Sequence, residues 1–172
     1  MRLAILTVSD AGARGERVDT SGDAVAAWAS ARGDTVVARA LVPDESVAIV
    51  RRLVAWCDCD AADLVLTTGG TGLSARDVTP EATTAVIERE AAGLVERIRV
   101  SALERVPRAA LSRAVAGVRH RTLIVNLPGS TAGVRDALAA LDPVVAHAVA
   151  VLRGTVTEHA PGATAPAEVG AP

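Results

Sequence analysis

The segment from Leu64 to Pro80, LVLTTGGTGLSARDVTP, constrains the fold of this chain more than any other. Its apolar start, Leu64 to Leu66, is typical of a strand buried on both faces, and three glycines follow within four residues. Thr79 and Pro80 then fit an N-cap and a first helical residue, which predicts a helix from about Pro80 to Glu90. The succession indicates a phosphate-handling turn, although a sharp turn without a ligand fits the same residues. A Walker loop is excluded because it requires a lysine, and the chain contains none.

Apolar, β-rich runs alternate with helix-forming stretches along the chain. We expect strands at 3–8, 35–42, 64–66 and 122–127. We expect helices at 21–31, 44–56 and 80–90, a less regular helical region at 94–118 interrupted by Pro107, and helices at 131–141 and 144–152 separated by Pro143. This alternation predicts a three-layer α/β/α fold with a mostly parallel central sheet, whose ligands bind beyond the carboxyl ends of the strands.

Length and composition set the domain and partner expectations. The chain of 172 residues predicts one domain over residues 1–154, and the aperiodic Ala, Pro, Gly, Thr and Glu of 155–172 predict a disordered tail. A net charge of -2 argues against a nucleic-acid or anionic-membrane partner. No apolar run approaches the roughly 20 residues of a membrane span, so a cytoplasmic protein is expected.

Five motifs follow one another in a specific order. They are TVSDAG and DTSG within Thr7 to Gly22, LVPDE from Leu41 to Glu45, TTGGTG and RDVTPEAT within Thr67 to Thr83, LSR from Leu111 to Arg113, and NLPGS from Asn126 to Ser130. Together they resemble the molybdenum-cofactor biosynthesis family, and within it the molybdopterin adenylyltransferases related to the gephyrin G domain. The resemblance covers residues 2 to 154. It implies a homotrimer that adenylylates molybdopterin with Mg-ATP, releasing pyrophosphate, and that works with a molybdate-inserting enzyme.

Asp44 and Asp77 match the acids of two of these motifs, and the resemblance implies that both are catalytic and hold Mg²⁺ and the ATP phosphates. Mg²⁺ usually takes one or two carboxylates together with substrate phosphates. The attack of a molybdopterin phosphate on the α-phosphate of ATP needs no protein nucleophile, only positioning and charge neutralisation. From the residues alone, Asp44 is better placed to N-cap a helix from Glu45, and Asp77 could be a solvated loop acid paired with Arg76.

The resemblance also implies substrate and cofactor contacts from four segments: Ser9, Asp10, Asp19, Ser21 and Gly22; Gly69, Gly70, Thr71 and Gly72; Ser112 and Arg113; and Asn126, Pro128, Gly129 and Ser130. Structural explanations exist beside these. Asp19 or Ser21 could simply cap a helix, Arg113 could be an exposed helical arginine, and the proline and glycine of the last segment could be purely conformational. Family members usually carry a proline where this chain has Thr131, which puts the rigidity of that turn in question.

Three classes of function fit these observations. The first is an adenylyltransferase, the second a non-catalytic molybdopterin-binding paralogue, and the third a scaffold trimer with protein partners. The presence of both Asp44 and Asp77 favours the enzyme, since binding alone would not need both acids.

Overall fold

A computed structural model describes residues 1–156, and the predicted tail lies outside them from residue 157 on. Its sheet has the order β2-β1-β3-β6-β5-β4, with β1 (Arg2–Val8), β2 (Thr35–Val42), β3 (Leu64–Thr68), β4 (Arg89–Glu90), β5 (Ala116–Arg119) and β6 (Thr122–Leu127). The first four strands in that order are parallel, whereas β5 is antiparallel to β6 and β4 to β5. The mostly parallel sheet expected from the sequence is confirmed.

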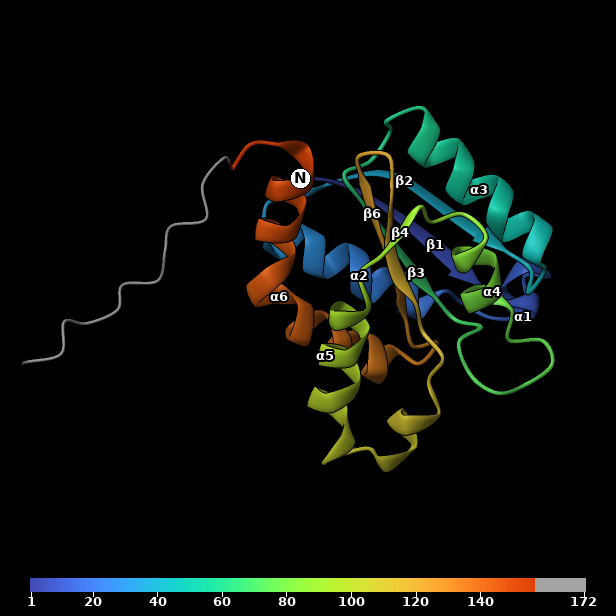
Figure 1. The fold of residues 1–172 in the computed structure, drawn as a ribbon. Helices are drawn as coiled ribbons and strands as arrows, with labels where there is room; N and C mark the ends of the chain where they lie inside the picture. The colour runs from blue at the N-terminus through green and yellow to red at the C-terminus, as the bar shows by residue number, and fades with distance from the viewer. Residues whose placement is uncertain (157–172) are drawn as a thin grey trace, which may run out of the picture.

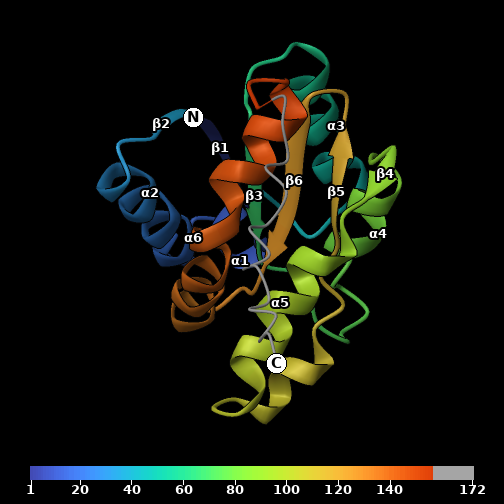
Figure 2. The ribbon, with the colours of Figure 1, turned by 60° about the vertical axis from the view of Figure 1, so that its left-hand side comes forward.

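Helices cover both faces of this sheet. They are α1 (Asp10–Ala13), α2 (Thr20–Ala31), α3 (Ser46–Asp58), α4 (Thr79–Thr84), α5 (Ala92–Leu103) and α6 (Thr131–Arg153), with a 3₁₀ helix η1 (Pro107–Leu111). Figure 1 shows α2, α5 and α6 on one side of the sheet and α3 and α4 on the other, and Figure 2 shows the same layers from a second direction. The three-layer α/β/α prediction is therefore confirmed. No helix within residues 1–156 has the length and apolar character needed to cross a membrane.

Two aliphatic cores lie between these layers, because successive residues of a strand point to opposite faces. Leu3 and Ile5 of β1 pack under α2, α5 and α6, whereas Ala4 and Leu6 pack under α3 and α4. All four side chains are fully buried. The continuous apolar runs of the parallel strands are thus explained by burial on both sides.

The structure corrects the two expected helical regions that follow the glycines after β3. The helix after the glycines ends at Thr84 instead of Glu90, and Val78 rather than Thr79 is its N-cap. The region 94–118 is helical only to Leu103, after which the chain forms η1 and then β5. Helix α4 is followed by the β-branched Val86 and Ile87, which favour extended backbone over helix and lead into β4.

The expected break at Pro143 is absent: α6 runs through it as one helix of 23 residues. Pro143 lacks the N–H that would otherwise donate to the carbonyl of Ala139, but most of the stability of a helix in a protein comes from its packing. Arg97 of α5 donates from Nε to the carbonyl of Ala140, in the turn that Pro143 interrupts, over 2.6 Å. Packing of α5 against α6 therefore outweighs the local preference of proline.

Candidate functional site

The site lies at the carboxyl ends of the parallel strands, where strand order reverses between β1 and β3. The chain leaves β1 towards β2 on one side, whereas β3 and β6 continue on the other. Crevices at such switch points are the usual ligand sites of open α/β sheets. The loop after β3, residues 69–78, is called the glycine loop below, and it forms the green arc at the lower right of Figure 1.

Two adjoining cavities border the glycine loop. The first, of about 300 Å³, is lined by Ser9, Asp19, Ser21, Asp44 and Gly69 among others. The second, of about 450 Å³, lies towards α5, η1 and α6, and its lining includes the expected residues Thr71, Gly72, Asp77, Ser112, Asn126 and Pro128. Gly70, Gly129 and Ser130 line both. Of the residues expected at the site, Asp10, Gly22 and Arg113 line neither cavity.

The backbone of the glycine loop requires its first two glycines. Gly69 has a φ of 99°, and a Cβ there would lie 2.2 Å from the carbonyl oxygen of Val8. Gly70 has a φ of 62°, and a Cβ there would lie 2.4 Å from Oγ1 of Thr79. That hydroxyl is itself fixed, because it donates to the carbonyl of Gly69 over 2.9 Å. The loop is thus pressed between the end of β1 and the start of α4.

Asp44 and Asp10 hold each other through their backbones. Oδ2 of Asp44 accepts the N–H of Asp10 at 2.7 Å, and Oδ1 of Asp10 accepts the N–H of Asp44 at 3.0 Å. Burial raises the pKa of Asp44, the charges of Asp10 and Asp77 add to the rise, and the N–H of Asp10 and the charge of Arg76 oppose it. Asp44 does not cap the following helix, because α3 begins at Ser46 with Glu45 as N-cap and no side-chain cap bond.

Asp77 belongs to the second half of the glycine loop. Its Oδ2 accepts the N–H of Ser74 at 2.8 Å and would lie 2.9 Å from a Cβ at Gly72. The expected alternative, a pair with Arg76, is not formed: Arg76 instead forks onto the carboxylate of Asp10, over 3.0 Å from Nε and 2.9 Å from Nη2. Asp77 is therefore part of the glycine loop and Asp44 approaches it at Gly70; both carboxylates are held by backbone amides, without an arginine bonded to either carboxylate among residues 1–156.

Two helix N-termini open at the same edge. Asp19 caps α2 by accepting the N–H of Gly22 at 2.8 Å, and it also accepts the hydroxyl of Thr7 at 2.7 Å. Ser130 caps α6, and the hydroxyls of Thr20 and Thr131 lie 2.8 Å apart and join the two helix starts. The capping role of Asp19 is thus confirmed, and Thr131 is part of the link. Backbone N–H groups at helix starts favour anionic ligands.

Asn126 is committed to the scaffold. It is fully buried, and its Nδ2 donates to the hydroxyls of Thr67 and Thr83 at 2.9 Å each. Its Oδ1 accepts the N–H of Val115 at 3.0 Å. The amide joins β3, β6 and α4 below the second cavity, so its side chain shapes the floor of that cavity.

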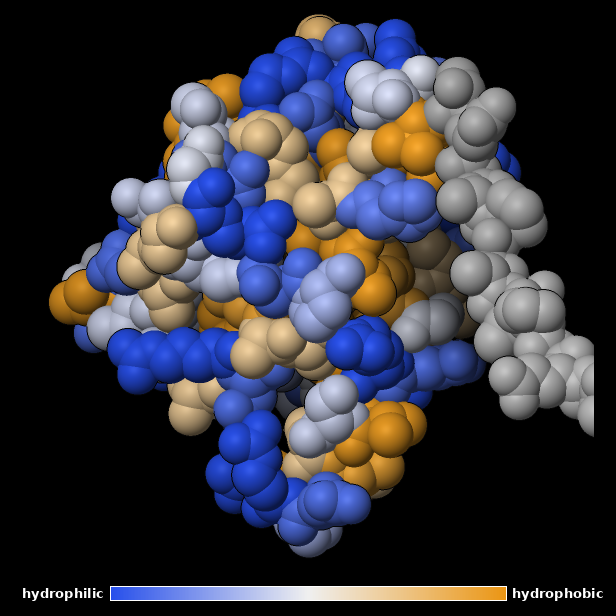
Figure 3. Space-filling model, turned by 90° about the vertical axis from the view of Figure 1, so that its left-hand side faces the viewer, coloured by the Kyte–Doolittle hydropathy of each residue, from blue (hydrophilic) through white to orange (hydrophobic). Residues whose placement is uncertain are grey.

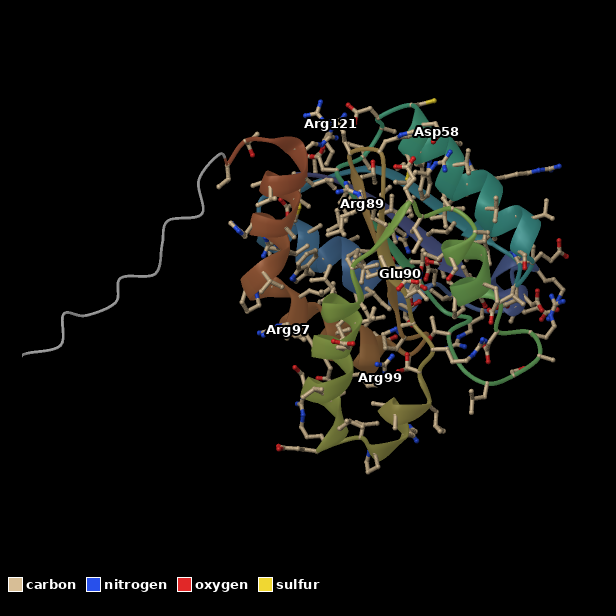
Figure 4. All side chains as sticks on the ribbon, in the orientation of Figure 1. Asp58, Arg89, Glu90, Arg97, Arg99 and Arg121 are labelled. Carbon is tan, nitrogen blue, oxygen red and sulfur yellow. The ribbon has the colours of Figure 1, made fainter. Side chains whose placement is uncertain are left out.

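Three arginines that the sequence did not single out line the cavities: Arg17 in the first, and Arg99 and Arg108 in the second. Figure 4 shows Arg97 and Arg99 leaving α5 in opposite directions. Arg99 donates to the carbonyl of Ser112 over 3.2 Å. Every one of the 18 basic residues is an arginine, so composition offers no signal that separates a cavity arginine from a surface one.

The acids at this site are suited to a hard cation that also takes ligands from water and substrate, and less to a metal ion whose ligands all come from the protein. Within residues 1–156, no group of three or more His, Cys, Asp or Glu is arranged to hold a metal ion. Mg²⁺ does not need such a group, since it is commonly held by one or two carboxylates, water and substrate phosphates. Asp44 and Asp77 fit that donor set. In each carboxylate the hydrogen bond from a backbone N–H goes to Oδ2, and Oδ1 of Asp44 faces the glycine loop at Gly70.

Comparison with known proteins places the chain in a family. A molybdopterin adenylyltransferase of Helicobacter pylori is 37% identical over 156 residues, 90% of this chain and 89% of its own. Molybdenum cofactor biosynthesis protein B of Escherichia coli is 44% identical over 137 residues, 79% of each chain. The crystal structure of the molybdopterin biosynthesis enzyme MoaB of Thermus thermophilus has a TM-score of 0.85 and 51% identity, covering 89% of this chain and 96% of that one. Residues 4–147 match the family described as "Probable molybdopterin binding domain", and the chain belongs to this family of molybdenum-cofactor biosynthesis proteins.

Proposed function

We propose that this protein is a molybdopterin adenylyltransferase that uses Mg-ATP, forming adenylylated molybdopterin and pyrophosphate. The observation that carries the proposal is the pair of acids, Asp44 against the glycine loop and Asp77 within it, at the switch point of the sheet. The two cavities that meet at this loop offer room for two ligands side by side. Similarity to adenylyltransferases over most of the chain agrees with it.

In this proposal the chain acts by binding and orienting. The starts of α2 and α6, joined through Thr20 and Thr131, present backbone N–H groups to phosphate oxygens. Gly70 and Gly129 line both cavities and let the attacking phosphate of molybdopterin approach the α-phosphate of ATP without a side chain between them. Mg²⁺, when held by Asp44 and Asp77, supplies neutralisation of the phosphate charge. Such positioning requires no protein nucleophile.

A product assay tests the proposal. Purified protein is incubated with molybdopterin and Mg-ATP, and adenylylated molybdopterin and pyrophosphate are measured against a reaction without protein. Formation of both in equal amounts is the expected result. Absence of adenylylated product from folded protein would contradict the proposed activity.

A second function, molybdopterin binding without catalysis, is favoured by one observation. Two relatives whose names state no adenylylation, MoaB of Thermus thermophilus and molybdenum cofactor biosynthesis protein B of Escherichia coli, are 51% and 44% identical to this chain. Binding of molybdopterin without product formation would support this function over the first. The presence of both acids favours the enzyme, because binding of molybdopterin alone would not need both Asp44 and Asp77.

We further propose that the protein is a homotrimer and passes its product to a molybdate-inserting enzyme in the cytoplasm. Apolar side chains reach the surface of the subunit, among them Val100, which is 67% exposed, and Leu111, which is 54% exposed. Figure 3 shows such apolar residues interspersed with charged ones on the face that carries α6. Light scattering should give about three times the chain mass of 17.5 kDa. A monomer across micromolar concentrations would contradict the trimer.

A further inference from the structure

Arg113 fastens the glycine loop to the body of the protein. Its backbone N–H donates to the carbonyl of Thr71 over 2.9 Å, and its Nε donates to the carbonyl of Gly72 over 2.7 Å. Its Nη2 donates to the carbonyl of Asp77 over 2.5 Å, and its Nη1 pairs with the carboxylate of Glu81. One residue thus holds the incoming arm of the loop, its outgoing arm and the first turn of α4.

Few other contacts tie residues 71–77 to the rest of the protein. The bonds of Ser74 and Asp77 to each other are local to the loop. Arg76 reaches Asp10 through an exposed ion pair, in which the arginine side chain is 59% exposed, and exposed pairs contribute little to stability. Leu73, at the tip, is 65% exposed and packs into neither core. The position of Asp77 therefore depends mainly on Arg113.

We propose that Arg113 is a positioning residue that sets the place of Asp77, and not a ligand of the substrate phosphate. The inference rests on the proposed function, since Asp77 is assigned there to Mg-ATP. Arg113 lines neither cavity, and its guanidinium is paired with the carboxylate of Glu81. Its Nε, Nη2 and Nη1 each already have a partner, two loop carbonyls and the carboxylate of Glu81, so a phosphate would compete with these three acceptors.

Arginine is the residue that this role requires. Its planar guanidinium presents donors in a fixed fork, which here serve two carbonyls and one carboxylate at once. A lysine ammonium is a compact charge on a flexible stem and cannot span these separated acceptors in the same way. Arg113→Lys should consequently restore only part of what Arg113→Ala loses.

The test compares Arg113→Ala and Arg113→Lys with Arg119→Ala. Arg119 is a matched control, because it also binds a carboxylate and a carbonyl, those of Asp58 and Val86, but lies at the opposite end of the sheet. Hydrogen exchange of the bonded amides of Ser74, Asp77 and Thr79 is measured in each protein. Arg113→Ala should exchange there about tenfold faster than wild type, as local opening becomes easier, Arg113→Lys should fall between, and Arg119→Ala should leave these amides unchanged.

Kinetics separate positioning from ligand binding. Displacement of a metal-binding carboxylate should lower kcat roughly a hundredfold with little change in the KM for molybdopterin. Raised KM with unchanged kcat and unchanged exchange would instead make Arg113 a direct phosphate ligand and overturn the proposal. Unchanged exchange together with unchanged kinetics would overturn it as well.

The test stays decisive if a variant does not fold or if the wild type shows no adenylylation. If Arg113→Ala does not fold, Glu81→Gln removes only the carboxylate partner and should give a smaller acceleration of exchange at the same amides; no acceleration would overturn the proposal. The exchange measurement does not depend on turnover. A wild type without adenylylation would therefore refute the proposed function while the loop-positioning role of Arg113 was still measured.

Discussion

At the carboxyl end of the sheet, Asp10 and Asp19 are paired with Arg76 and Arg39, but Asp44 and Asp77 are held differently from these and from the acids at the amino end. At the amino end, where Figure 4 labels Asp58 and Arg121, carboxylates are paired with arginines: Asp63 with Arg2 and Arg153, and Asp58 with Arg119. At the carboxyl end, Asp44 and Asp77 accept backbone N–H groups instead. An acid whose charge is neutralised within the protein stabilises the fold, whereas an acid without a paired cation keeps its charge for a ligand.

The pKa values of Asp63 and Asp44 differ in the same sense. Burial of Asp63 would raise its pKa, but hydrogen bonds from Arg2 and Arg153 overcome that and lower it to about 2. The effect of burial on the pKa of Asp44 is not offset by such bonds, and this pKa is raised. Perturbed acids with an unfavourable ionised state are typical of functional sites.

The largest expected effect is on catalysis. Asp77→Asn removes a metal-binding charge with little change in size, so adenylylation should fall by at least about a hundredfold. Asp58→Asn, at the other end of the sheet, serves as the control and should leave the rate of product formation near that of wild type. Near-normal turnover of a folded Asp77→Asn protein would contradict both the role of Asp77 in metal binding and the contrast between the two ends of the sheet.

Unfolding at acid pH should show that Asp63, at the amino end of the sheet, stabilises the fold. Because the folded pKa of Asp63 is about 2, below the ordinary 3.8, its contribution to stability is present above about pH 4 and is lost as the pH falls towards 2. That shift corresponds to about 2 kcal/mol for this largely buried side chain. Urea unfolding of Asp63→Asn should show this loss at pH 7, and the gap to wild type should narrow below pH 4. A gap independent of pH would contradict the assignment.

Substitution of one glycine at each end of the sheet allows the backbone at the two ends to be compared. Gly33 has a φ of 73°, and a Cβ added there would meet nothing within 4 Å, whereas Gly70 has a φ of 62° and a Cβ that would clash with Thr79. Alanine in left-handed backbone costs about 1–2 kcal/mol. Gly33→Ala should show that cost alone and keep turnover, while Gly70→Ala should lose more stability and also lose activity. Equal unfolding free energies with retained turnover would show that the loop is freer than its contacts indicate.

The smallest expected effect is the stability of Asp44→Asn. Burial disfavours the ionised carboxylate, and an asparagine oxygen can still accept the N–H of Asp10. The free energy of unfolding at pH 7 should stay within about 0.5 kcal/mol of wild type or rise. Because the raised pKa means that stability falls as pH increases through it, any gain of the variant should grow with pH. A large loss, measured by urea unfolding, would return Asp44 to a structural role.

The sequence was sufficient for the parallel part of the fold and not for its antiparallel edge. The runs at β1, β2, β3 and β6 are long and aliphatic, so their strands were predicted closely. Strand β4 has two residues and β5 begins with Ala116 and Gly117, so neither carries a β pattern of its own. They form because β6 offers a free edge, which is tertiary information.

The site shows the same limit. The order of the motifs predicted that Asp44, Asp77 and the glycines lie at one edge of the sheet, and the structure places them there. The sequence could not show that the polar groups of Asn126 and Arg113 bond to the scaffold, because their partners lie 11 to 59 residues away in the chain. Nor could it distinguish Arg99 and Arg108 from other arginines.

The most direct measurement is the rate of adenylylated molybdopterin formation in Asp44→Asn, Asp77→Asn and the double variant, each checked for a native melting temperature. If the two acids serve one Mg-ATP site, each single substitution should abolish most of the activity and the double should be little worse than either, because residues that act as a unit are strongly non-additive. If Asp44→Asn retains product formation, or if the two losses multiply as independent effects, a single site flanking the glycine loop is contradicted.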